Sequence, residues 1–157
     1  MAIREIRKYD DSALYKVCRP VEKFDAKLGE LLDDMAETMY EANGVGLAAP
    51  QVGILRRVVV IDVGNGIIEL VNPRIISASG SELASEGCLS FPGEYGLVER
   101  PTEVEVEAQD RNGQWFTIRS EGDHLLARAF CHETDHLDGK VFKTLAERML
   151  DEDEMEE

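Results

Sequence analysis

The most restrictive feature of the sequence is the run His132-Glu133-Thr134-Asp135-His136 near its end. It lies in residues 123–138, whose apolar pattern predicts an α-helix closed by Gly139. Side chains four residues apart share one helix face, so the two imidazoles can bind one divalent metal ion. Glu133 lies about 100° around the helix from His132, where it can reach a water molecule without being a ligand. This HExxH arrangement requires that the helix face a pocket.

The same helix carries an apolar stripe that continues this face. Leu125 and Ala129 fall in line with the histidines, as a pocket for an apolar side chain beside a metal would require. A catalytic metal needs about three protein ligands and an open position. The third ligand has two candidates, Cys88 in the run EGCLS and Glu147 downstream of the helix. The residues alone leave this choice open.

The rest of the chain predicts a single α+β domain. Residues 25–42 show apolar residues at helical spacing, with Asp25 as the N-cap. Strands are predicted at residues 56–63, 67–76 (broken near Pro73, with part at a sheet edge), 103–108 and 115–119, the last two joined by a turn at Arg111-Asn112-Gly113. We expect one domain over residues 1–150 and a disordered tail over residues 151–157, in which six of seven residues are acidic.

Composition excludes several classes of partner. The 157 residues include 32 Asp and Glu against 17 Lys and Arg, a formal net charge of −15. Nucleic acids and anionic membranes are therefore poor partners. No apolar run approaches the ~20 residues of a membrane span, and the N-terminal segment resembles no secretory signal. An odd number of cysteines without such a signal indicates the reducing cytoplasm, with Cys18 as a bystander and Cys131 as a small packed residue.

Three segments together resemble the signature motifs of the peptide deformylase family. They are GVGLAAPQ at residues 44–51, EGCLS at 86–90 and HETDH at 132–136, in this order. The resemblance extends from the first helix to about Phe142. It implies antiparallel β-sheets packed around a central helix that carries HExxH. It also implies a hydrolase of protein biosynthesis that removes the N-formyl group from the N-terminal methionine of new polypeptides and releases formate.

The resemblance further implies a metal site and its ligands. The family's ligands match Cys88, His132 and His136, which favours Cys88 over Glu147. The expected cofactor is one divalent ion, Fe²⁺ first, with Zn²⁺, Ni²⁺ or Co²⁺ as substitutes. Two alternatives remain: an HExxH metallopeptidase with Glu147 as its third ligand, and a non-catalytic binding module stabilised by the metal.

Other residues acquire roles through the same resemblance. The catalytic glutamate matches Glu133, and the oxyanion donors match the side chain of Gln51 and the backbone N–H of Leu89. Backbone contacts with the peptide substrate match Val45, Gly46, Glu86 and Gly87. We also expect Arg100 to form an ion pair with Glu86 or Asp135.

The expected partners are N-formyl-methionyl peptides of nascent chains. Some family members dock on the ribosome through a long basic C-terminal helix. A transient ribosome contact is compatible with this role, but the acidic tail here cannot make it through the same electrostatics. Direct nucleic-acid binding and membrane association are not expected.

Overall fold

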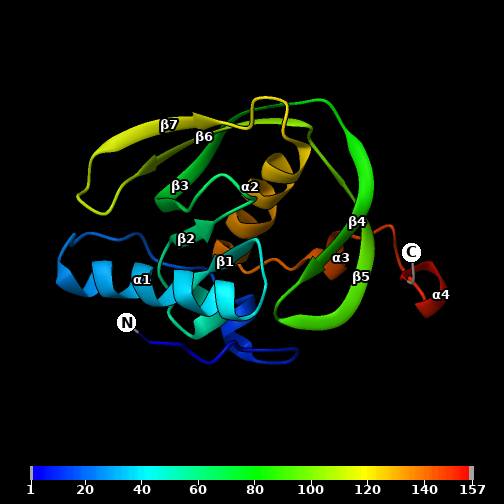
Figure 1. Ribbon diagram of the computed structural model, residues 1–157, viewed down its shortest axis with the longest axis horizontal. Coiled ribbons are helices and arrows are strands. Elements are labelled where there is room, and N and C mark those ends of the chain that lie inside the picture. Colours follow the sequence, from blue (N-terminus) through cyan, green and yellow to red (C-terminus); the bar gives the residue numbers. More distant parts are fainter. Residues whose placement is uncertain (1, 156–157) are drawn as a thin grey trace.

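The computed structural model describes residues 2–155, which form two antiparallel sheets and two long helices (Figure 1). The first half of the chain contains η1 (Ser12–Tyr15), α1 (Ala26–Glu41), β1 (Gly46–Ala48), η2 (Ala49–Val52), β2 (Val58–Ile61) and β3 (Ile68–Ser79). The second half contains β4 (Glu82–Cys88), β5 (Phe91–Arg100), β6 (Glu103–Gln109), β7 (Trp115–Arg119), α2 (His124–Leu137), α3 (Phe142–Leu145), β8 (Arg148–Met149) and α4 (Glu152–Met155). The predicted α+β class is confirmed.

Helix α1 begins and ends where its sequence predicts. The Asp25 carboxylate accepts a hydrogen bond from the N–H of Leu28 at 3.1 Å, which caps the first turn. At the other end Asn43 has a φ of 58°, and the N–H of Gly44 donates to the Met39 carbonyl at 3.0 Å. The helix buries five apolar side chains at helical spacing, namely Leu28, Leu31, Leu32, Met35 and Met39.

The larger sheet, in the order β1-β2-β3-β6-β7, is covered on both faces at its centre. Alternate residues of β2 point to opposite faces. Val58 and Val60 pack in the cluster of α1, whereas Val59 and Ile61 pack in the cluster of α2. This explains why the β2 sequence is an unbroken apolar run rather than an alternating one. Helix α2 crosses the middle of the molecule in Figure 1, as expected of the central helix.

Strand β3 differs from its prediction. It runs without interruption through Pro73, and its register shifts between Val71 and Arg74 instead of breaking. A β-bulge accommodates a proline that cannot donate to the ladder. Residues 68–71 pair with β2, whereas the residues after Pro73 pair only with β6, so part of the strand does lie at an edge.

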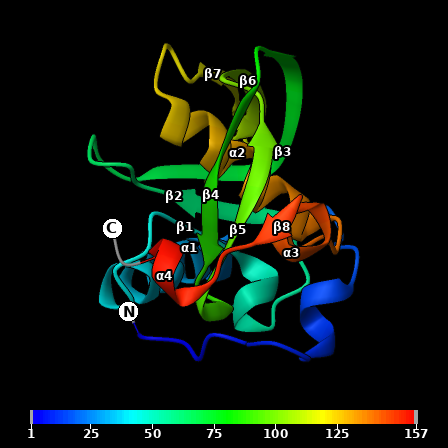
Figure 2. The ribbon, with the colours of Figure 1, turned by 90° about the vertical axis from the view of Figure 1, so that its right-hand side faces the viewer.

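The smaller sheet, in the order β4-β5-β8, was not predicted as such. The β4–β5 hairpin curves along one side of the molecule in Figure 1, and Figure 2 shows β8 beside β5. The sheet brings the EGCLS segment, which includes the end of β4, towards α2. Strands β1 and β4 are edge strands of their respective sheets.

The C-terminal segment contains one further helical turn, α4, after β8. Arg148 forms an ion pair with Glu154 at 2.5 Å. Residues 156–157 lie outside the described residues, so the disorder expected for residues 151–157 stays a prediction, as does the domain boundary at residue 150. Within residues 2–155, none of the helices combines the length and the hydropathy that crossing a bilayer requires.

Candidate active site

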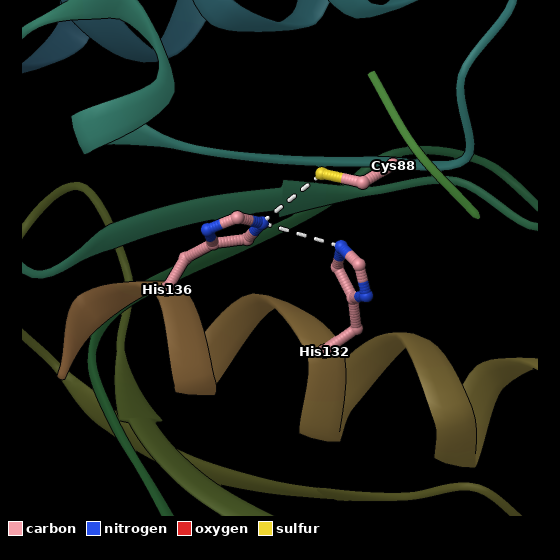
Figure 3. Close-up of side chains that lie close together, drawn as sticks. All are labelled: Cys88, His132 and His136. Carbon is pink, nitrogen blue, oxygen red and sulfur yellow. Dashed lines mark hydrogen bonds between the residues drawn. The ribbon is translucent and has the colours of Figure 1, made fainter. Parts of the chain in front are cut away.

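Three donor atoms from two distant segments converge beside α2 (Figure 3). The Nε2 atom of His136 lies 3.3 Å from the Sγ atom of Cys88 and 3.3 Å from the Nε2 atom of His132. All three donor atoms lie within 4.8 Å of one another. Nitrogen and sulfur ligands bound tetrahedrally at ~2.0–2.3 Å from one ion are themselves ~3.3–3.6 Å apart. The donor set therefore fits one divalent metal ion with a coordination position left open.

Local structure explains why these atoms meet. The two histidines lie one turn apart near the end of α2. Cys88 ends β4 at a register shift, where Gly87 pairs with Tyr95 but Cys88 pairs with Phe91. Such an irregularity changes the direction of the next side chain. It allows the Cys88 sulfur to face the helix.

A buried charge network orients His132. The Glu86 carboxylate lies 2.6 Å from Nδ1 of His132, which leaves Nε2 free to face the other donors. Arg100 donates two hydrogen bonds to the same carboxylate, at 2.7 and 3.0 Å, and Arg128 donates a third at 3.0 Å. Arg100 also donates to Asp135 at 2.7 Å. Both of the ion pairs considered for Arg100 are therefore present.

The cluster surrounds His132 with negative groups and keeps His136 neutral. Burial alone would raise the pKa of Glu86, but the hydrogen bonds from His132 and Arg100 outweigh burial and hold this pKa at about 2. Burial would lower the pKa of His132, yet Glu133, Cys88 and Glu86 raise it well above its usual value. Burial lowers the pKa of His136 well below its usual value, which keeps that ring in the neutral, metal-binding form.

Replacing Glu86 with glutamine is expected to lower the free energy of unfolding by about 3–5 kcal/mol. Arg100 and Arg128 would each lose a buried charged partner, and His132 would lose its carboxylate. Urea denaturation of the variant measures the change. Glu105→Gln is the matched control, because it removes a carboxylate from an exposed arginine, Arg119. Equal losses of unfolding free energy in both variants would show that the buried charge network of Glu86 adds no more stability than an exposed ion pair.

Glu133 lies beside the donor set without belonging to it. Its side chain is buried, and burial raises its pKa to about 7. Its Oε1 atom has no hydrogen-bond partner within residues 2–155. A buried carboxylate oxygen without a partner is costly in a structural role, so it indicates a group held ready for a proton.

Gln51 is fixed in one orientation at the same site. Its Oε1 accepts a hydrogen bond from the N–H of Ala48 at 2.9 Å, and its Nε2 donates to Oγ of Ser90 at 3.0 Å. The same Nε2 lies 3.5 Å from Sγ of Cys88. Sequence reasoning missed Ser90, although it ends the EGCLS run, and also missed Arg128, which no local pattern singles out.

A cavity of about 440 Å³ opens beside these residues. It confirms the expected apolar stripe, because Leu125 and Ala129 line it together with His132 and Glu133. The other candidate residues that line it are Val45, Gly46, Gln51, Glu86, Gly87, Cys88 and Leu89. Substrate could therefore reach both the donor set and Glu133 from this cavity.

The remaining candidates lie elsewhere. Glu147 is exposed between α3 and β8, and within residues 2–155 the metal-binding group consists of Cys88 and the two histidines. Cys18 and Cys131 are buried, and burial raises the pKa of each thiol to about 11. Both are packed, protonated side chains at neutral pH.

Comparison with known proteins identifies the family. The sequence model of the family described as Polypeptide deformylase matches residues 3–151. The chain belongs to this family. A peptide deformylase of Caldicellulosiruptor bescii is 58% identical over 157 residues, which are 100% of this chain and 93% of the relative.

Solved structures of deformylases have the same fold. The crystal structure of the Thermotoga maritima peptide deformylase superposes with a TM-score of 0.88 at 41% identity, covering 92% of this chain and 97% of that one. A Synechococcus elongatus peptide deformylase in complex with actinonin also gives 0.88 at 41% identity, covering 92% and 79%. Membership of the deformylase family, together with the position of Glu147, supports a deformylase over the metallopeptidase alternative.

Proposed function

We propose that this chain removes the N-formyl group from the N-terminal methionine of newly synthesised polypeptides and releases formate. The observation that carries the proposal is the convergence of Cys88, His132 and His136 beside the unpartnered carboxylate of Glu133, at the wall of one cavity. Membership of the deformylase family supports the same reaction.

One divalent ion fits the three donors, and we propose Fe²⁺ as the native one, with Zn²⁺, Ni²⁺ or Co²⁺ as substitutes. Thiolate and imidazole ligands suit all four of these ions. When bound, the ion supplies Lewis-acid chemistry, which polarises a carbonyl and makes water more acidic. The thiolate of Cys88 places more negative charge beside the ion than a third imidazole would.

The residues of the chain then perform the proton transfers and bind the developing charge. Glu133 accepts a proton from the attacking water as the water oxygen bonds to the formyl carbon. Negative charge builds on the former carbonyl oxygen, and we propose that the Gln51 amide and the Leu89 N–H donate to it. Glu133 next gives the proton to the amine nitrogen as the carbon–nitrogen bond breaks. The products are formate and a free N-terminal amine.

Two sheet edges favour an extended peptide in the cavity. Strand β1 contains Gly46 and strand β4 contains Glu86 and Gly87, and each strand lies at the edge of its sheet. An edge strand offers unpaired backbone groups to an added strand. We propose that the substrate backbone binds there, at Val45, Gly46, Glu86 and Gly87. The methionine side chain would then pack against the apolar stripe of α2.

Formate release from a matched pair of tripeptides tests the proposed function. The chain is purified without oxygen, its metal content is measured, and it receives formyl-Met or acetyl-Met tripeptide. We expect rapid formate release, and acetate release slower by about 10²-fold, because we propose that the site leaves no room beside the donor set for the extra methyl group. Metal-replete protein that releases no formate would contradict the proposal.

Gly46 provides a second test, because it packs directly against the proposed base. A Cβ atom at this position would lie 2.5 Å from Oε2 of Glu133. Gly46→Ala should therefore displace the carboxylate and lower kcat by about 10²-fold. Gly29→Ala is the control, since its Cβ would make only ordinary contact in α1 and should leave kcat unchanged. A normal kcat in Gly46→Ala would show that Glu133 tolerates displacement.

The proposal also covers the extent of the catalytic domain, its compartment and its partners. We propose that the catalytic domain spans residues 1–150 and acts in the cytoplasm, where nascent formylated chains are made. Its negative charge opposes direct nucleic-acid binding. A transient ribosome contact remains a proposal without a docking element assigned to it.

A further inference from the structure

A second cavity lies apart from the active site, beside the N-terminal half of α1, the darker blue end of that helix in Figure 1. Its volume is about 590 Å³, and it shares no lining residue with the first cavity. We call it the basic groove, defined by the cationic side chains of Arg19, Lys23, Lys27 and Arg56 together with the apolar floor beneath them.

The charge of this groove is opposite to that of the chain. Ten of the 17 lysines and arginines form ion pairs with carboxylates within residues 2–155, and seven do not. Four of those seven line the basic groove. In a chain of net charge −15, unpaired cations gathered at one cavity indicate a site for an anionic ligand.

Two of these cations are held next to each other by the backbone. Arg19 and Arg56 are partners in an isolated parallel bridge, in which the Arg19 N–H donates to the Leu55 carbonyl at 3.1 Å. Like charges held opposite each other repel unless an anion lies between them. A guanidinium group binds a carboxylate through two parallel hydrogen bonds, so each arginine can hold one carboxylate of a ligand.

The acidic residues of the groove do not neutralise it. Two acids line the groove, Glu22 and Asp25, and the Asp25 carboxylate also caps α1. Arg4 also lines the groove but is paired with Asp34 at 2.8 Å. Two acids therefore face four cations that have no ion-pair partner within residues 2–155.

The floor of the groove is aliphatic, so a matching ligand carries aliphatic side chains as well as negative charge. It is formed by Val21, Leu28, Leu31, Ile54 and Val58. Within the described chain, no aromatic side chain lines the groove, so it offers no platform on which nucleobases could stack. The strong negative charge of the rest of the surface also repels a long polyanion. Carboxylates combined with aliphatic side chains match the groove better than a nucleic acid does.

We propose that the basic groove is a docking site for an acidic peptide segment of a partner protein. Its carboxylates pair with Arg19 and Arg56, and its aliphatic side chains pack on the floor of the groove. A volume of this size accommodates a short segment, and such a small contact suits a weak, transient interaction. The proposal does not depend on the reaction catalysed at the other cavity.

Fluorescence anisotropy with the metal-loaded full chain tests this site. The probe is a labelled peptide of about ten residues that alternates glutamate and leucine. We expect saturable binding with a dissociation constant of about 10–100 μM. Peptides in which glutamine replaces glutamate should bind at least about tenfold more weakly, because they lose the pairing with the arginines. Peptides in which serine replaces leucine should lose as much, because they no longer pack on the floor of the groove.

Two double variants separate the groove from the overall charge. Arg19→Glu with Arg56→Glu should weaken binding by about tenfold or more and leave formate release unchanged. Lys8→Glu with Lys140→Glu changes the net charge equally, at exposed cations outside the groove, and should change the affinity by less than about twofold.

Four results would overturn the proposal. They are equal losses in the two double variants, no saturation below about 1 mM peptide, binding of a single-stranded RNA of equal charge as tight as that of the peptide, and self-association of the chain that the groove variant abolishes. The third result would identify a nucleic acid as the ligand, and the fourth would identify a second copy of this chain.

Discussion

Replacing Glu133 with glutamine is expected to lower kcat by about 10²–10⁴-fold while the chain remains folded and keeps its metal. The amide has nearly the same shape as the carboxylate but cannot accept a proton from water. The wild-type side chain is well suited to this transfer. Burial raises its pKa to about 7, and its Oε1 atom has no competing partner within residues 2–155.

Steady-state kinetics and metal analysis of the same preparation check this result. Glu94→Gln is the matched control, because Glu94 lies on the rim of the same cavity and pairs with Lys143. It should keep kcat within about twofold, as expected for an exposed ion pair. A Glu133→Gln variant with normal kcat would require another base. Loss of metal from that variant would show that Glu133 maintains the site instead.

The elements predicted from periodicity are those whose burial is simple. Helix α1 has one apolar face, α2 is buried on nearly all sides, and each begins at a capping aspartate, while β2 is buried on both faces. The sequence of the β6–β7 hairpin alternates and contains a turn with Gly113 at a φ of 86°. In each of these elements, local sequence and tertiary environment agree, so a short window contains the whole signal.

The β4–β5 hairpin shows where such reasoning fails. Strand β4 consists largely of small and polar residues, and most of it is only half-buried, so its side chains form no apolar pattern. Gly87 lies where a Cβ would come within 2.6 Å of the Tyr95 ring. That glycine is required by a contact with the neighbouring strand, and no local pattern reveals it.

Local sequence also predicts some residues of the candidate metal site and not others. The two histidines lie four residues apart on one helix, so their spacing alone places them together. Cys88 is 48 residues before His136, and only the family resemblance selected it over Glu147. Ser90 and Arg128 act on Gln51 and Glu86 through contacts across the fold, which neither spacing nor residue type indicates.

Replacing Cys88 with alanine is expected to remove both metal and activity, whereas Glu147→Ala should leave both nearly unchanged. Loss of a partner that only orients a ligand already costs about 10–100-fold in metal affinity, so loss of one of three ligands should cost more than about 10²-fold. Cys88 is only half-buried at the end of β4, so the alanine variant should still fold. Metal analysis after dialysis against a weak chelator, followed by formate release, provides the two measurements.

The pair of variants is decisive because the two candidate ligands give opposite results. Cys88 supplies a soft sulfur next to the imidazoles, whereas Glu147 supplies a hard carboxylate from the exposed segment between α3 and β8. Metal retained by Cys88→Ala but lost by Glu147→Ala would mean that α3 and β8 rearrange to bring that carboxylate to the histidines. The chain would then use the ligand set of a metallopeptidase within a deformylase fold, and neither Gln51 nor Leu89 would have a place in the reaction.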